Sequence, residues 1–175
     1  FLIAMTSSRA SLELRRMAKE NRTLYEVAQS LSSTLRLRQV LELIVRNALQ
    51  VIEAKGCAIR LYDEETGELR PAAMVGLSEE YWSKGPVRIE DSPMDQRVMA
   101  GEPVQDRDVG HSSLWQYPEA ARREKIRSVL SVPLRSKNAI HGVIRVYSSH
   151  RRAFNAREIN LLTAFANQAA VAIEN

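Results

Sequence analysis

The chain begins and ends with long segments in which apolar residues recur at helical spacing. In the first segment, positions three and four residues apart follow the a/d pattern of a coiled coil. These positions are Leu14, Met17, Asn21, Leu24, Ala28, Leu31 and Leu35. Asn21 falls on an a position, where a buried asparagine favours two strands. The same pattern also fits a helix packed on its own domain, with Asn21 at the surface.

Hydroxyl side chains at residues 32–34 are expected to interrupt this helix, because they compete for backbone hydrogen bonds. A second amphipathic helix is predicted over residues 37–54. The last helix is predicted to begin after Asn155 as N-cap, with Glu158 completing a capping box. Its apolar stripe contains small alanines that would let another helix approach closely. We expect a dimer interface there, formed by Leu162, Ala166, Ala169 and Ile173.

Between the helical ends, short apolar runs separated by turns predict two hairpins, over residues 57–75 and 127–148. A short helix is predicted from Ser92 as N-cap to Gly101 as C-cap. Residues 102–105 should form an edge strand, because the proline among them cannot donate a backbone hydrogen bond. Hairpins flanked by helices predict an α+β fold, an antiparallel sheet with the terminal helices on one face.

The period of two along a strand separates the two faces of the predicted sheet. Apolar side chains on one face should meet the helices; they are Ile59, Leu61, Ile144 and Val146. Arg60 and Arg145 then point to the other face, because an unpaired arginine buried under the helices is costly. Two guanidinium groups there favour a small anionic ligand, such as a carboxylate, held by bidentate hydrogen bonds. Alternatively, both arginines are hydrated or paired with acidic residues of a covering loop.

Several short segments, in this order and spacing, resemble the GAF family over about residues 24–175. They are residues 58–63, 76–77, 101–104, 131–134, 142–148 and 154–175. The end of the chain is especially similar to GAF domains in bacterial sensor histidine kinases and related signalling proteins. The resemblance implies a GAF/PAS-like sheet with a ligand pocket on the face opposite the helices. Residues 1–23 are then an N-terminal signalling helix or linker, and residues 24–175 the GAF domain.

The short helix and the irregular segment after it would complete this pocket. The candidates are Met94, Val98, His111, Trp115 and Tyr117. The two aromatic residues fit either a lid over a ligand or anchors that pin the loop to the sheet. His111 is the one candidate for a haem ligand, but a lone loop histidine is usually solvated. We therefore expect no haem or other prosthetic group, and the ligand is unknown.

Other activities of the family need residues that this chain lacks. The pattern typical of cyclic-nucleotide binding is matched at Phe154 and Glu158, but Arg157 replaces its aspartate. Bilin attachment and methionine sulfoxide reduction use cysteines, and the single cysteine, Cys57, opens a predicted strand. Nucleophile, phosphate-loop and metal-ligand motifs are missing from the sequence. These observations predict a regulatory domain with no catalytic or metal site.

Charge and composition bear on the partners and the cellular location that the sequence predicts. The net charge of +4 arises within residues 1–55, which hold nine Lys/Arg and five Asp/Glu, whereas residues 56–175 are neutral. This distribution argues against a nucleic-acid-binding face. A single cysteine and the lack of a complete signal peptide favour the cytoplasm. The apolar residues 1–5, followed by basic ones, fit the inner end of a membrane span or a linker.

Together these features predict a cytoplasmic sensory module of a bacterial signalling protein, with a sensor histidine kinase as the favoured type. The module would form a homodimer through its terminal helices, bind a small anion and act on an output domain in the same chain. The alternative is a spacer that dimerises and transmits a signal without binding a ligand.

Overall fold

A computed structural model describes residues 2–175, which divide into two compact units, one ending at Leu37 and one spanning Arg38–Asn175. The second unit begins later than the predicted domain start at residue 24. Helix α1 (Leu2–Val51) contributes to both units. The predicted break at residues 32–34 is wrong. The Thr34 hydroxyl donates to the carbonyl of Ser30 at 2.9 Å, so it bonds within the helix.

The strands form one antiparallel sheet of six strands within the described residues, in the order β3-β2-β1-β6-β5-β4. Both predicted hairpins, β1–β2 and β5–β6, are confirmed, and β4 lies at the edge as the proline before it suggested. The two-residue strand β3 was not predicted. The bounds are β1 (Gly56–Asp63), β2 (Glu68–Val75), β3 (Val87–Arg88), β4 (Val104–Asp106), β5 (Ser128–Ser136) and β6 (Ala139–Ser148).

Helices α3 and α5 begin at the caps that the sequence indicated. The Ser92 side chain accepts from the Asp95 amide at the start of α3, and Asn155 and Glu158 form the predicted capping box at the start of α5. Gly101 comes one residue after the C-cap of α3 and has a φ of +108°, which favours glycine. The bounds are α2 (Glu79–Trp82), η1 (Ile89–Asp91), α3 (Pro93–Met99), η2 (Val109–His111), α4 (Pro118–Arg123) and α5 (Ala156–Glu174).

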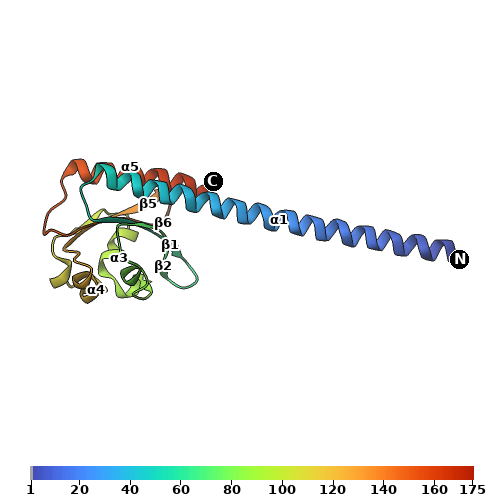
Figure 1. Ribbon diagram of the computed structural model, residues 1–175, viewed down its shortest axis with the longest axis horizontal. Coiled ribbons are helices and arrows are strands. Elements are labelled where there is room, and N and C mark those ends of the chain that lie inside the picture. Colours follow the sequence, from blue (N-terminus) through green and yellow to red (C-terminus); the bar gives the residue numbers. More distant parts are fainter. Residues whose placement is uncertain (1) are drawn as a thin grey trace. The chain divides into compact units, whose positions relative to one another are not determined.

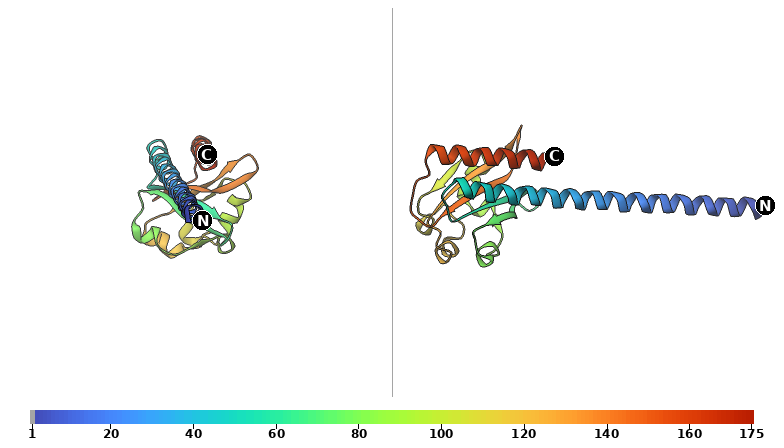
Figure 2. Two further views of the ribbon diagram at one scale, coloured as in Figure 1. Left: turned by 90° about the vertical axis from the view of Figure 1, so that its right-hand side faces the viewer. Right: turned by 45° about the horizontal axis from the view of Figure 1, so that its top comes forward.

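The sheet of the second unit separates two layers. Helix α5 and the last turns of α1 lie over one face, and α3 and α4 lie over the other (Figures 1 and 2). The α3 side holds an apolar cluster that includes Ala58, Val143 and Tyr147 from the sheet. Ile59 and Ile144 alternate with these residues and are fully buried, so they face the helices as predicted.

The prediction of a dimer interface on the last helix is wrong for three of its four residues. Leu162, Ala166 and Ala169 are fully buried within the chain, because this stripe of α5 packs on β5. Only Ile173 stays partly exposed. Spacings of three and four residues mark any helix face that is buried, against a sheet as well as against a second helix. Within residues 2–175, no helix combines the length and apolar character needed to cross a membrane.

Candidate functional site

The candidate site lies on the α3 side of the sheet, where β1 and β6 run next to each other. Arg60 on β1 is paired with Val143 on β6, and Arg145 is paired with Ala58. The two arginines are therefore diagonal neighbours on one face, as the strand periodicity predicted. Their side chains are only 2% and 3% exposed. Burying two guanidinium groups this completely is costly unless partners compensate their charges.

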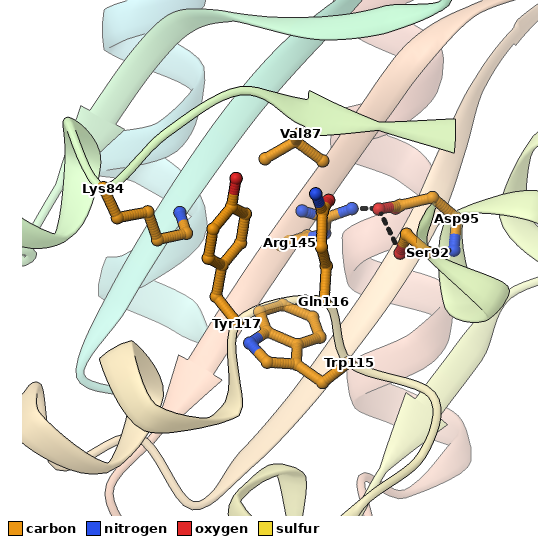
Figure 3. A pocket seen from close by; sticks show the side chains of 8 residues that line it. All are labelled: Lys84, Val87, Ser92, Asp95, Trp115, Gln116, Tyr117 and Arg145. Carbon is orange, nitrogen blue, oxygen red and sulfur yellow. Dashed lines mark hydrogen bonds and ion pairs between the residues drawn. The ribbon is translucent and has the colours of Figure 1, made fainter. Parts of the chain in front are cut away.

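Arg145 has such partners. Its guanidinium forms an ion pair with Asp95 of α3, donates to Ser131 Oγ at 3.0 Å and lies 5.3 Å from the centre of the Trp115 ring. Asp95 in turn accepts a hydrogen bond of 2.7 Å from Ser92 (Figure 3). Arg145 thus has an acidic partner, as the alternative expected, but this partner comes from helix α3 and not from the covering loop.

Arg60 lacks a comparable partner. Its Nη1 donates to the carbonyl of Leu69 at 3.3 Å, and the Trp82 ring lies over the guanidinium at 4.5 Å. Nε and Nη2 are buried and have no hydrogen-bond partner among the described residues. Burial lowers the pKa of Arg60, with a further contribution from the charge of Arg145. The structure therefore holds a buried cation without a counter-ion.

Lys84, which follows α2, adds a third basic side chain. Its Nζ lies over the Tyr81 ring at 4.0 Å and 5.4 Å from the Tyr117 ring. Burial, reinforced by Arg60 and Arg145, lowers its pKa to about 6. Burial is the main cause of this shift, and the charges of the two arginines add to it, so Lys84 is mostly neutral at neutral pH.

The cavity at this site, here called the cationic cavity, is small and covered. It is lined by Lys84, Val87, Ser92, Asp95, Trp115, Gln116, Tyr117 and Arg145 (Figure 3). Its volume of about 10 Å³ is room for about one water molecule. The covering loop, residues 112–117, is fastened to β3 and to the residue before it. The Tyr117 hydroxyl donates to the Pro86 carbonyl at 2.5 Å, and Gln116 accepts from the Arg88 amide at 3.2 Å.

The predicted pocket residues divide into four groups. Arg145, Trp115 and Tyr117 line the cationic cavity. Arg60 is buried beside this cavity and is not one of its lining residues. Met94 and Val98 are fully buried in the apolar cluster beside it, together with the sheet residues of that face. His111 lies outside the cavity lining: its side chain is 71% exposed, and its ring nitrogen is 3.2 Å from Asp108.

Sequence reasoning missed Lys84 and the role of Asp95. Ser92 and Asp95 were visible as the start of a short helix, but a cap pattern does not tell which distant side chain the carboxylate will reach. Lys84 sits in a polar stretch without periodicity. Only its position next to two buried arginines, which no local pattern encodes, singles it out.

Replacing Lys84 with methionine is expected to remove a pH-dependent part of the stability. Its pKa is about 6 in the folded protein against an ordinary 10.5, so between these values the unfolded chain binds a proton that the folded protein lacks. Lys84 therefore makes the free energy of unfolding rise with pH in this window, by at most about 1.4 kcal/mol per pH unit. Below the window, both states hold the proton and the folded state bears the full cost of burying it.

The gain in stability from Lys84→Met should thus be largest near pH 6 and shrink towards pH 10. Urea unfolding of variant and parent at both pH values measures it. Lys137→Met is the matched control, because Lys137 is exposed in the β5–β6 turn. Equal gains at the two pH values would show that Lys84 is charged in the folded protein throughout.

The geometry defines a small α+β domain with a covered cavity beside two buried arginines on one face of its sheet. The chain belongs to the GAF domain family, whose model matches residues 34–174. It is 25% identical over 150 residues to a Nif-specific regulatory protein of Herbaspirillum seropedicae, covering 83% of this chain. The match spans 28% of the length of that relative.

Solved structures show the same fold. The GAF domain/HD domain protein of Geobacter sulfurreducens superposes with a TM-score of 0.71 at 17% identity, covering 82% of this chain and 95% of that chain. A domain assigned to a two-component sensor histidine kinase of Sinorhizobium meliloti 1021 superposes with a TM-score of 0.67 at 23% identity, covering 78% of this chain and 89% of that one. GAF domains of signalling and regulatory proteins are thus the class to which this chain is similar.

Proposed function

We propose that this chain is a sensory module of a bacterial signalling protein that binds a small anion in the cationic cavity. Binding would alter the pairing of two copies through the first helix and so regulate an output domain. The relatives support the regulatory setting, since one is a Nif-specific regulatory protein and another is assigned to a sensor histidine kinase. The observation that carries the ligand is the buried guanidinium of Arg60 beside the cavity, which has no counter-ion among the described residues.

Basic side chains outnumber carboxylates in and beside this cavity. In the part of the chain that the structure describes, Arg60 and Arg145 lie close enough for their charges to repel, Lys84 beside them has a lowered pKa, and Asp95 is paired with Arg145 alone. An anion would relieve this repulsion, and its binding would be strengthened by the low exposure of the site. The cavity must widen to admit it. The covering loop is the element that would move. It is held closed by hydrogen bonds to residues 86–88, by the bond from the Met94 amide to the Leu114 carbonyl and by the burial of Trp115.

A lid of this kind couples the ligand to conformation. A ligand shifts an equilibrium only by its different affinity for the two states. Here the closed loop without ligand leaves Arg60 uncompensated, whereas the loop rearranged around an anion would not. The free-energy difference between the two loop positions would therefore be electrostatic, and a ligand that changes it would change the position of the loop.

Pairing through the first helix is supported by its exposed apolar residues. In the first unit, Leu14, Met17, Leu24 and Leu31 keep between 58% and 68% of their surface exposed. They repeat at the spacing of a coiled coil, and a contiguous apolar stripe of this kind marks an interaction surface. A second copy of the chain supplies a matching stripe.

The spacer function is the second candidate, and the small volume of the cavity favours it. Native mass spectrometry of the purified protein distinguishes the two. We expect a bound small anion that dissociates on mild activation, and anions added to the emptied protein should raise its melting temperature. If no anion co-purifies and none in a panel of carboxylates, phosphate and sulfate changes the melting temperature, the sensory function is wrong and the spacer function stands.

Replacing Asn21 with leucine tests the pairing. A buried asparagine at an a position restricts a coiled coil to two strands at a cost in stability. We expect the parent to form dimers and Asn21→Leu to form tighter assemblies with a mixture of larger species. Sedimentation equilibrium measures both. Lys19→Leu is the control, because Lys19 occupies the outward f position of the preceding heptad. A parent protein that stays monomeric at high concentration contradicts the proposed coiled-coil pairing through the first helix.

A further inference from the structure

The free donors of Arg60 have a specific arrangement. Nε–H and an Nη2–H lie along one edge of the guanidinium group, and neither of these two nitrogens has an acceptor among residues 2–175. The third nitrogen, Nη1, already donates to Leu69 on the neighbouring strand. Two parallel N–H groups on one edge match the two oxygens of a carboxylate. The unsatisfied part of Arg60 is therefore shaped for a planar anion.

The surroundings leave this edge to an external partner. Asp95 is committed to Arg145 and Ser92. The Trp82 ring covers one side of the guanidinium plane at 4.5 Å, which leaves the plane's edge as the direction for a hydrogen-bonded ligand. Lys84 lines the adjoining cavity and is close enough to Arg60 for the two charges to repel.

We propose that a small-molecule carboxylate binds along the free edge of Arg60 through two parallel hydrogen bonds, with the Lys84 ammonium as its second cationic contact. This assignment rests on the proposed sensory function and narrows its ligand class. The Tyr117 ring lies between Lys84 and Arg145 and must move aside as the carboxylate enters (Figure 3). Breaking its hydrogen bond to Pro86 releases it.

A carboxylate fits this site better than phosphate. Its two oxygens are satisfied by the two donors of Arg60, with Lys84 adding a third. Phosphate brings four oxygens, and charged oxygens buried without donors are costly. The aromatic groups around the site, Trp82, Trp115 and Tyr117, suit the apolar remainder of an organic acid.

Binding should also take up a proton. Lys84, with a pKa of about 6, is mostly neutral at pH 7.5 in the free protein. The groups facing it are Arg60 from β1, Arg145 from β6, Tyr81 from α2, Tyr117 from the covering loop and Glu124 after α4. Only Glu124 favours its charged form among the ionised groups. A carboxylate next to Lys84 adds a second negative charge, so the lysine gains a proton as the ligand binds.

Intrinsic fluorescence provides the readout, because both tryptophans of the chain, Trp82 and Trp115, lie at the site. The probes are acetate and benzoate, with acetamide and benzamide as neutral counterparts and inorganic phosphate as the rival anion. We expect saturable fluorescence changes with the carboxylates alone. Calorimetry in two buffers of different ionisation enthalpy should show uptake of up to one proton at pH 7.5, and Lys84→Met should abolish the uptake.

Variants of Arg60 distinguish the contribution of its two-donor edge to ligand binding from that of its positive charge. Arg60→Met should remove carboxylate binding, at least a tenfold loss, while the melting temperature holds or rises, because a buried uncompensated charge is removed. Arg60→Lys keeps a charge but lacks the two-donor edge, so it should also bind at least fivefold more weakly. The matched control is Arg70→Met on β2, since Arg70 is exposed and pairs with Asp63. Its binding should equal that of the parent.

The outcomes distinguish this assignment from the sensory function. If an anion binds but Arg60→Met leaves its affinity unchanged, the Arg60 assignment is wrong and the sensory function stands. If phosphate binds and both carboxylates do not, the ligand class is wrong. If neither the probes nor a co-purified anion binds at all, both the assignment and the sensory function fail.

Discussion

Replacing Asp95 with alanine is expected to lower the free energy of unfolding by about 3–5 kcal/mol, the usual cost of removing one partner of a buried ion pair. Asp95 is 2% exposed, and its loss leaves Arg145, at 3% exposed, without a counter-charge in the sheet. It also removes the acceptor of the Ser92 hydroxyl. Urea unfolding monitored by circular dichroism measures the change.

A double variant shows whether the charge left behind causes this loss. Asp95→Leu with Arg145→Met replaces the pair by apolar groups of similar size, which is often neutral or stabilising. We expect it to recover most of the stability. Ser92→Ala keeps the pair and loses a helix cap, which costs about 0.5–2 kcal/mol. If Asp95→Ala costs no more than Ser92→Ala, the ion pair is not what holds α3 to the sheet.

The two arginines illustrate what the sequence can and cannot predict about the site. The period of two along β1 and β6 was sufficient to place Arg60 and Arg145 on one face, because a strand alternates its side chains regardless of context. Whether each was paired could not be predicted. The partner of Arg145 is 50 residues away along the chain, on a different element, and no local pattern encodes such a contact.

Helix boundaries could be predicted from the sequence more readily than the surfaces against which the helices pack. The caps Ser92 and Asn155 were predicted, because a cap is a local hydrogen bond between neighbouring residues. The expected break at residues 32–34 did not occur, because serine and threonine lower helix propensity by an amount that surrounding residues easily outweigh. The stripe on the last helix was found, but its partner was not, since a core and a dimer interface need the same apolar spacing.

Replacing Leu162 with alanine should lower the free energy of unfolding by about 2–5 kcal/mol without altering the association of the chain. Leu162 is fully buried where α5 packs on β5. Ala166 and Ala169 lie on the same stripe and are too small to move into the space that it leaves. Sedimentation at several concentrations, combined with urea unfolding, measures association and stability on the same sample.

Leu24→Ala is the counterpart, because Leu24 belongs to the first unit and is 68% exposed. It should weaken association while leaving the unfolding of dilute, dissociated protein nearly unchanged. The two leucine-to-alanine variants remove the same atoms, so their contrast depends on position alone. If Leu162→Ala weakens association at full stability, α5 contacts a second copy after all, and the stripe cannot be the core of the domain. If Leu24→Ala destabilises the dilute protein by a similar amount, the apolar stripe of the first helix packs within its own chain.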